Sequence, residues 1–252
     1  MTTYQKLLDI QKEKGAGYLV LIDPDKKSVA ELTDFAKTCE AGGVDALLVG
    51  GSLLFSAHFD ELIRSLKEAV KLPVILFPGN GMQLSHHADA VLFMSLVSGR
   101  NPHFLIGEQV QYAPVVYALK IEPISMAYML IESGCVTTAE FMSHSKPIPR
   151  EKPEIAAAHV LAAQYLGMSL VYLEAGSGAK ESVPEALIQT IKRVASVPII
   201  VGGGIRTPEE AARKVEAGAS FVVTGNVLET GAPPELIRAF ANAVHGRGRD
   251  AG

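Results

Sequence analysis

The feature that most constrains the fold of this chain is a pair of glycine groups about twenty residues apart, each following an apolar run and preceding a helix-like segment. Gly202-Gly203-Gly204 follows residues 197–201, and Thr224-Gly225-Asn226 follows residues 219–223. Two successive strands that end in this way direct backbone N–H groups and positive helix ends toward one point, which is a site for a phosphate dianion. In a (β/α)8 barrel the pair falls after strands 7 and 8, where such barrels hold phosphorylated ligands. The pattern therefore predicts a protein that handles a phosphorylated small molecule.

Strand-like apolar runs alternate with helix-like segments along the chain. The eight predicted strands are residues 18–22, 44–49, 74–77, 90–94, 115–121 (with 126–132 as an extension), 170–174, 197–201 and 221–224. The predicted helices are residues 29–41, 59–70, 102–112, 151–166, 184–195, 208–217 and 234–244. Strands that alternate with helices indicate a parallel sheet, and eight of them indicate a closed barrel. The predicted fold class is therefore α/β, a (β/α)8 TIM barrel.

One connection is too short for a regular barrel. Only about eight residues separate Pro78-Gly79-Asn80-Gly81 from the strand predicted at residues 90–94, whereas a parallel crossover needs about a dozen or more. We therefore predict that the third helix is missing or irregular. The length of 252 residues matches the roughly 250 residues of a typical barrel, so residues 1–252 are predicted to form a single domain.

Charge and composition exclude several classes of function. The formal net charge of −4 argues against bulk nucleic-acid binding. Cys39 and Cys135 have no neighbouring Cys or His at metal-ligand spacing, so both are interpreted as reduced thiols of an intracellular protein. Because neither a secretory signal nor an apolar stretch of about 18 residues is visible, a cytoplasmic protein without a membrane span is expected.

Functional residues of a barrel lie at the C-terminal ends of its strands, and the most informative of these ends is the segment Tyr172-Leu173-Glu174-Ala175-Gly176-Ser177-Gly178. Strand alternation places Tyr172 and Glu174 on one face and Leu173 on the other. The glycines around Ser177 can bring backbone N–H groups close to an anion. Glu174 beside that anion could accept a proton from a hydroxyl of the same ligand. The alternative is a strand end with a glycine turn and a solvated glutamate.

Two further segments are candidates for binding a metal. Asp23-Pro24-Asp25-Lys26 ends the first predicted strand and could supply an oxygen ligand to Mg²⁺, although a turn with helix-capping aspartates is favoured in isolation. Ser52, taken alone, is interpreted as a turn or cap residue. His86-His87 lacks a third ligand in the local pattern, so surface histidines are predicted there rather than a metal site.

Together these segments resemble the geranylgeranylglyceryl phosphate synthases, the prenyltransferases that form the first ether bond of archaeal-type lipids and have relatives in bacteria. The resemblance extends in order from the first predicted strand to the last. Its motifs are Leu21-Ile22-Asp23-Pro24-Asp25-Lys26, Val49-Gly50-Gly51-Ser52, Phe77-Pro78-Gly79-Asn80, Ser98-Gly99-Arg100-Asn101-Pro102, Phe104-Leu105-Ile106-Gly107, Met142-Ser143, Pro147-Ile148-Pro149, residues 172–178, Val201-Gly202-Gly203-Gly204-Ile205 and Thr224-Gly225-Asn226.

The resemblance implies an activity and a site. It implies a Mg²⁺-dependent prenyltransferase that joins sn-glycerol 1-phosphate to a polyprenyl diphosphate of the geranylgeranyl type by an ether bond and releases diphosphate. Asp23 and Ser52 would be the Mg²⁺ positions, and Glu174 would be the base for the attacking hydroxyl. It also implies a homo-oligomer, dimer or hexamer, with at most transient membrane contact. The acceptor would be bound by Tyr172, Leu173, Glu174, Ala175, Gly176, Ser177, Gly178, Gly203, Gly204, Gly225 and Asn226.

The chain departs from the family pattern after the fifth predicted strand. Met126 and Ala127 stand where the family has Thr and Gly, which bears on the prenyl groove and the donor length rather than on the chemistry. Phe55, Leu92 and Met126 are the candidates for the groove lining. One alternative is another phosphate-binding barrel enzyme (an isomerase, aldolase or lyase), for which Lys120 would be the lysine. The other is a non-catalytic sensor of a phosphorylated metabolite.

Overall fold

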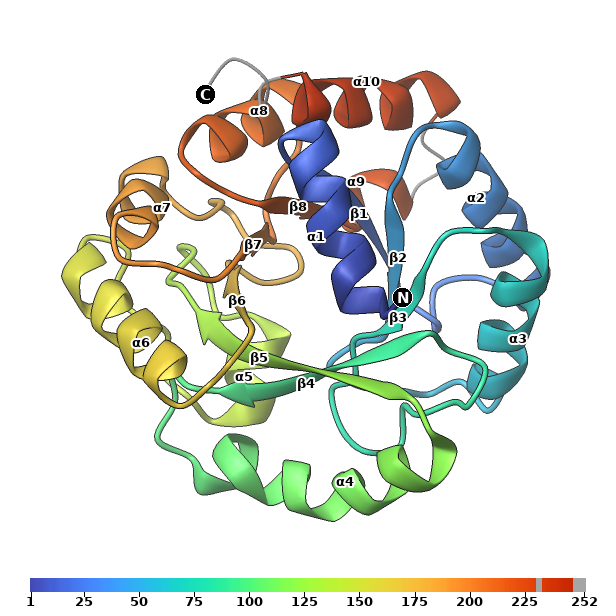
Figure 1. Ribbon diagram of the computed structural model, residues 1–252, viewed down its shortest axis with the longest axis horizontal. Helices are drawn as coiled ribbons and strands as arrows, with labels where there is room; N and C mark the ends of the chain where they lie inside the picture. Colours follow the sequence, from blue (N-terminus) through green and yellow to red (C-terminus); the bar gives the residue numbers. More distant parts are fainter. Residues whose placement is uncertain (230–232, 247–252) are drawn as a thin grey trace.

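The computed structural model describes residues 1–229 and 233–246 and shows a closed barrel of eight parallel strands (Figure 1). Each strand pairs in parallel with the next one in sequence, and the last pairs with the first. The predicted (β/α)8 fold is therefore confirmed. The strands are β1 (Gly17–Ile22), β2 (Ala46–Val49), β3 (Val74–Leu76), β4 (Ala90–Leu96), β5 (Glu122–Leu130), β6 (Leu170–Glu174), β7 (Ile199–Gly202) and β8 (Phe221–Thr224).

Helices surround the barrel as an outer layer (Figure 1). Residues 77–89, all of which the structure describes, form no helix between β3 and β4, so the prediction of a missing third helix is confirmed. The helices are α1 (Thr3–Lys14), α2 (Val29–Ala41), α3 (Phe59–Ala69), the π-helix η1 (His103–Gly107), α4 (Glu108–Leu119), α5 (Thr138–Ser143), α6 (Pro153–Tyr165), α7 (Glu185–Lys192), α8 (Pro208–Glu216), α9 (Asn226–Glu229) and α10 (Pro234–His245).

The first helix covers the N-terminal end of the barrel. The backbone N–H groups of Thr3 and Tyr4 donate to the carboxylate of Glu122 at the start of β5, over 2.5 and 3.0 Å. The Tyr4 hydroxyl donates to the carbonyl of Ser169, just before β6, and Leu7 is buried in the barrel interior. Figure 1 shows α1 in front of the barrel centre, so that view looks at the N-terminal end. The functional end of the barrel is the opposite one.

The fifth strand does not lie at residues 115–121, where the apolar run predicts it. Most of those residues belong to α4, and β5 follows them. Tyr112 and Val116 are four residues apart and both buried on one face of α4, whereas Tyr117 is 87% exposed. Packing of that face outweighs the β-propensity of adjacent valines. Lys120 ends the helix with a left-handed φ of 56°. It therefore does not lie at a strand end, which argues against the alternative of a barrel enzyme that uses this lysine.

The core has two layers of apolar side chains. One layer fills the barrel interior and includes Tyr172, and the other lies between strands and helices and includes Leu173. The predicted alternation at the end of β6 is therefore confirmed. Within residues 1–229 and 233–246, no helix combines the length and apolar character needed to cross a membrane.

Candidate active site

The central residue of the site is Glu174, the last residue of β6. Its side chain is buried, and its Oε1 accepts a hydrogen bond of 2.6 Å from the backbone N–H of Gly176. The hydroxyls of Tyr128 and Tyr172 also donate to this carboxylate. The structure therefore contradicts the alternative of a solvated glutamate at a strand end, because the carboxylate is enclosed and every bond just named comes from the protein.

Burial raises the pKa of Glu174 from 4.5 to about 7, because removing the carboxylate from water disfavours its charged form. The hydrogen bonds from Gly176, Tyr172 and Tyr128 act in the opposite direction and lower the pKa, but their effect is smaller. A carboxylate with a pKa near neutrality is well matched to proton transfer at physiological pH. Glu174 therefore has the electrostatic character of a general base.

Three aromatic rings support Glu174 from below, inside the barrel. The ring centroids of Phe77 and Tyr172 are 5.2 Å apart, and that of Tyr128 lies 5.8 Å from Phe77 and 5.6 Å from Tyr172. Burial, with a further contribution from the negative charge of Glu174, raises the pKa of both tyrosines well above 10, so both hydroxyls stay protonated and remain donors. The roles of Phe77 and Tyr128 were not predicted, because Phe77 directly follows β3, Tyr128 lies in β5, and the two rings meet only in the closed barrel.

Glycines with positive φ surround the carboxylate. Gly176 and Gly178 have φ of 104° and 74°, and Gly203 and Gly204 have φ of 80° and 71°. A β-carbon on Gly176 would lie 2.2 Å from the side chain of Thr137, and one on Gly203 would lie 2.4 Å from Oε1 of Glu174. Gly176 and Gly203 therefore require glycine both for backbone conformation and for space, whereas Gly178, where an added β-carbon would meet no atom within 4 Å, requires it for conformation. Consecutive residues of this kind form anion-binding concavities from backbone N–H groups.

The loops after β6, β7 and β8 meet as the sequence predicts. A β-carbon on Gly203 would lie 2.5 Å from the backbone nitrogen of Gly176, which shows how closely the β6 and β7 loops approach. The hydroxyl of Ser177 donates to Oδ1 of Asn226 over 2.9 Å, which joins the β6 loop to the start of α9 after β8. Residues from three predicted segments thus lie together at this end of the barrel.

Asp23 and Ser52 lie in neighbouring loops after β1 and β2. Oδ1 of Asp23 accepts from the backbone N–H of Asp25 over 3.0 Å, so the turn expected as an alternative is present. A β-carbon on Gly51 would lie 3.9 Å from the same oxygen, which places the carboxylate beside the loop of Ser52. The donors available here are carboxylate and hydroxyl oxygens, the ligands that Mg²⁺ prefers. The residues therefore fit a magnesium ion by donor type.

Comparison with known proteins decides which kind of barrel this is. The profile of the PcrB family matches residues 8–244. The chain belongs to the PcrB family. It is 50% identical over 230 residues to the geranylgeranylglyceryl phosphate synthase of Thermococcus gammatolerans, covering 91% of this chain and 90% of that protein. It is 43% identical over 243 residues to the synthase of Chitinophaga pinensis, covering 96% of this chain and 95% of that protein.

A solved structure agrees with these relatives. The crystal structure of (S)-3-O-geranylgeranylglyceryl phosphate synthase from Thermoplasma acidophilum, in complex with its substrate sn-glycerol-1-phosphate, matches with a TM-score of 0.93 and 37% identity. The match covers 98% of this chain and 99% of that one. The resemblance predicted from the motifs is therefore confirmed, and so is the expectation of a prenyltransferase enzyme of this kind.

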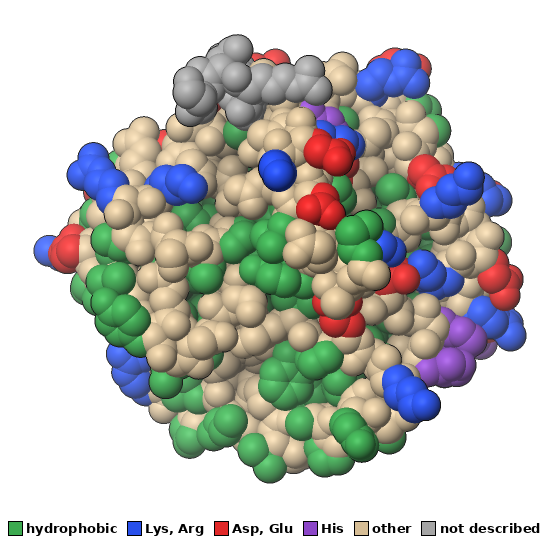
Figure 2. Space-filling view, viewed as in Figure 1, with side chains coloured by type: hydrophobic (Ala, Val, Ile, Leu, Met, Phe, Trp, Pro, Cys, Tyr) green, Lys and Arg blue, Asp and Glu red, His purple; other side chains and the backbone are tan. Residues whose placement is uncertain are grey.

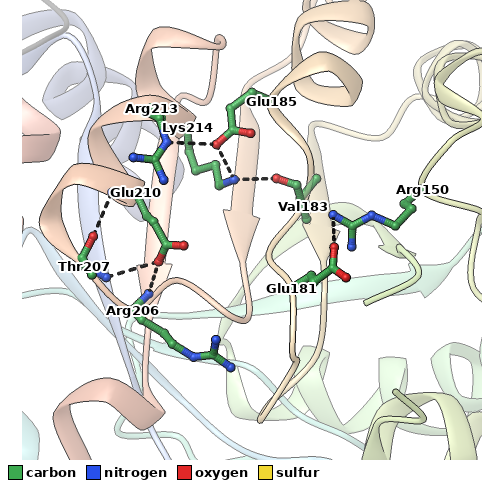
Figure 3. A network of polar contacts seen from close by, with 9 residues as sticks. All are labelled: Arg150, Glu181, Val183, Glu185, Arg206, Thr207, Glu210, Arg213 and Lys214. Carbon is green, nitrogen blue, oxygen red and sulfur yellow. Dashed lines mark hydrogen bonds and ion pairs between the residues drawn. The ribbon is translucent and has the colours of Figure 1, made fainter. Parts of the chain in front are cut away.

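Arg206 of this PcrB-family protein anchors the loop that follows β6. Its guanidinium donates to the carbonyls of Ala179 and Lys180 over 2.8 and 3.2 Å. Its own backbone N–H donates to Glu210, which also forms the capping box of α8 with Thr207 (Figure 3). Arg206 thus links the loops after β6 and β7. The sequence holds a weak signal for this residue, because it follows the first glycine group, Gly202-Gly203-Gly204, by two positions.

Two further cations hold the end of the same loop (Figure 3). Lys214 is 2% exposed, and its ammonium donates to the carbonyl of Val183 over 2.7 Å and to Glu185 over 2.8 Å. Arg150 pairs with Glu181 over 2.7 Å. No local signal marks Lys214, because a lysine on an amphipathic helix is ordinarily a surface residue.

The irregular segment between β3 and β4 supports the loop of Ser52. The buried side chain of Gln83 donates to the carbonyl of Gly51 over 2.8 Å and accepts from its N–H over 3.1 Å. Two of the candidates for the groove lining are placed differently from expectation: Leu92 and Met126 are fully buried in the barrel interior, so they face no groove. Strand alternation turns these two side chains inward. Phe55 is 83% exposed.

Proposed function

We propose that this protein is a prenyltransferase that forms an ether bond between sn-glycerol 1-phosphate and a polyprenyl diphosphate of the geranylgeranyl type, with release of diphosphate. The observation that carries the proposal is Glu174, a buried carboxylate with a pKa of about 7 beside glycines of positive φ. The complex of the Thermoplasma acidophilum relative with sn-glycerol-1-phosphate supports the choice of acceptor.

The acceptor would bind through its phosphate. The surface formed by Gly178, Gly203 and Gly204, together with Ser177 and Asn226, suits a compact dianion. A three-carbon acceptor held at its phosphate end would direct its far hydroxyl toward Glu174. Fixing both ends in this way removes the entropy cost of orienting the nucleophile.

The chemical step is a displacement at the allylic carbon of the donor. The acceptor hydroxyl oxygen forms the new C–O bond, the bond to the diphosphate breaks, and its electron pair leaves with the diphosphate. Glu174 takes the hydroxyl proton. Because the allylic carbon becomes electron-poor as the old bond breaks, the hydroxyl becomes acidic and a base of pKa near 7 suffices.

Asp23 and Ser52 would hold Mg²⁺. The ion, when bound, would neutralise charge on the diphosphate leaving group. Asp25 keeps this region in place by accepting from the backbone N–H groups of Phe55 and Ser56 over 2.9 and 2.6 Å, which ties the β1 loop to the β2 loop. Asp23 therefore needs no large rearrangement to stay beside the loop of Ser52.

The same proposal includes self-association. Apolar side chains are exposed on η1 and α4: Ile106 is 59%, Val110 64%, Val115 44% and Tyr117 87% exposed. Figure 2 shows apolar side chains gathered over α4 at the edge of the molecule. Contiguous exposed apolar surface of this kind marks an interaction site. A second copy of this chain is the proposed occupant, giving a homo-oligomer.

The experiment that tests the reaction is mass spectrometry of the products formed from geranylgeranyl diphosphate, Mg²⁺ and either enantiomer of glycerol phosphate. We expect an ether-linked product from the sn-1 isomer alone. Longer donors are tried in parallel, because the donor length that is accepted depends on the depth of the prenyl groove. No product from either isomer with any donor, while circular dichroism reports a folded protein, would overturn the proposal and favour the sensor alternative.

A further inference from the structure

The irregular segment that replaces the third helix carries two adjacent histidines at its outer edge. Residues 85–88 form a turn in which the backbone N–H of Ala88 donates to the carbonyl of Ser85 over 3.3 Å. His86 and His87 occupy the two central positions of that turn, and their ring centroids are 3.8 Å apart. Figure 2 shows histidine side chains at the edge of the molecule beside α3.

A carboxylate from a different element faces this pair. Asp60 lies in the first turn of α3, and its Oδ2 is 3.8 Å from Nε2 of His87. One ligand atom from each of Asp60, His86 and His87 lies within 4.8 Å of the other two. The third ligand that the local pattern lacks is therefore supplied by the fold, from a helix more than twenty residues earlier.

A buried serine orients the carboxylate. The hydroxyl of Ser85, a residue 2% exposed, donates to Oδ1 of Asp60 over 2.6 Å and accepts from the backbone N–H of His87 over 3.3 Å. One carboxylate oxygen is thus occupied by the turn, and the other is directed toward the imidazoles. An outer hydrogen bond of this kind is the usual way in which a carboxylate ligand is held in place for a metal.

We propose that Asp60, His86 and His87 bind a divalent transition-metal ion of the Zn²⁺ type. Two imidazole nitrogens and one carboxylate oxygen are a donor set that such ions accept, with water in the remaining position. Ligands about 2.0–2.1 Å from the metal lie roughly 3.4 Å from one another. The three side chains reach that spacing by rotation, because Asp60 and His86 are exposed and His87 is half-buried.

The bound ion joins α3 to the segment that stands in place of the third helix. Both elements that the ion would join border the loop of Ser52. Helix α3 follows that loop, and Gln83 of the irregular segment is hydrogen-bonded to Gly51. Nitrogen donors distinguish this site from the oxygen donors around Asp23, so Mg²⁺ does not occupy it. The site is a structural metal site and takes no part in the proposed reaction.

The test is metal titration of the full chain carrying no histidine tag. Isothermal calorimetry with Zn²⁺, and Co²⁺ absorption as a spectroscopic readout, are expected to report one equivalent bound at this site, and Zn²⁺ is expected to raise the melting temperature of the parent more than that of the histidine variants. His86→Ala, His87→Ala and the isosteric Asp60→Asn are each expected to weaken Zn²⁺ at least tenfold. His58→Ala and His103→Ala are matched controls, because each removes an exposed histidine beside a carboxylate, Glu61 or Glu108.

Circular dichroism in the presence of EDTA confirms that each variant is folded before titration. Equal Zn²⁺ affinity in the parent and in both His86→Ala and His87→Ala would overturn the proposal. So would an equal loss of affinity in the two control variants, because the binding would then be distributed over surface histidines. The outcome does not depend on the proposed prenyltransferase activity, since every readout is metal binding or stability.

Discussion

Replacing Glu174 with glutamine is expected to stabilise the ligand-free protein in neutral and alkaline solution while it abolishes the reaction. Burial raises the pKa of this carboxyl from 4.5 to about 7. Below pH 4.5 the group is protonated in both the folded and the unfolded protein, so burial of its charge does not lower the free energy of unfolding. As pH rises from 4.5 to about 7, the unfolded chain ionises first, so the free energy of unfolding falls. Above pH 7 the cost is constant.

The size of that cost follows from the pKa change. Each tenfold difference in proton affinity is worth about 1.4 kcal/mol, so a rise from 4.5 to about 7 costs about 3 kcal/mol at pH 8. Glutamine carries no charge at any pH, and its amide oxygen can still accept the hydrogen bond of the Gly176 N–H. We therefore expect Glu174→Gln to exceed the parent in unfolding free energy by roughly this amount at pH 8, and to match it near pH 4.5.

The assay is urea denaturation of parent and variant at half-unit steps from pH 4.5 to 8.5, followed by fluorescence or circular dichroism. Glu13→Gln, at an exposed carboxylate on α1, is the control and should show no comparable gain. In the same pH series the turnover of the parent should rise toward pH 7 as Glu174 loses its proton. A difference in unfolding free energy that stays flat across the series would refute the reasoning, because Glu174 would then not be a buried acid with a raised pKa.

Four further predictions concern the loops and the surface. Gly203→Ala places a β-carbon 2.4 Å from Glu174 at a φ of 80°, so we expect a loss of at least about 100-fold in kcat/KM and 1–3 kcal/mol or more in stability. Gly167→Ala is the control: the φ of Gly167 is similar, but no atom lies within 4 Å of the added β-carbon, so this variant reports the backbone strain without the clash. Arg206→Ala removes two bonds to the β6 loop and should raise KM for glycerol phosphate about tenfold, whereas Arg213→Ala, measured in the same kinetics, should not. Asp23→Asn should raise the Mg²⁺ concentration for half-maximal activity at least about tenfold, with the exposed Asp34→Asn unchanged; equal values for the two would remove Asp23 from the magnesium proposal. Val110→Glu should reduce the oligomer to smaller species in light scattering, while Leu166→Glu, at another exposed position, should not; an unchanged mass for Val110→Glu would move the interface away from α4.

Local patterns along the chain are enough to predict the barrel and the centre of the candidate site. The alternation of apolar runs with helical segments predicts a barrel of eight strands and locates all of them except the fifth, and the short gap after residue 77 predicts the missing helix. Glycines that follow β6 and β7 mark where the backbone takes positive φ beside Glu174. These features can be predicted from the sequence because each depends on residues close together in the chain: side-chain periodicity, turn chemistry and the length of a connection.

The same local reasoning is wrong where two local patterns compete. The apolar pattern of residues 115–121 fits either a strand or the end of a buried helix, and in the structure most of these residues belong to α4. Burial of Tyr112 and Val116 on one face settles the competition, and that burial depends on the barrel already being closed. A short apolar run cannot be assigned by periodicity alone.

Properties that depend on distant residues were beyond the reach of those patterns. The pKa of Glu174 depends on its burial in the closed barrel, where the hydroxyl of Tyr128 from β5 reaches it. Lys214 becomes a loop anchor because a carbonyl 31 residues away points at it. His86 and His87 gain a third donor only when α3 packs beside their turn. Propensity and periodicity act over a few residues, whereas desolvation and donor geometry arise only when segments far apart in the chain share one small volume.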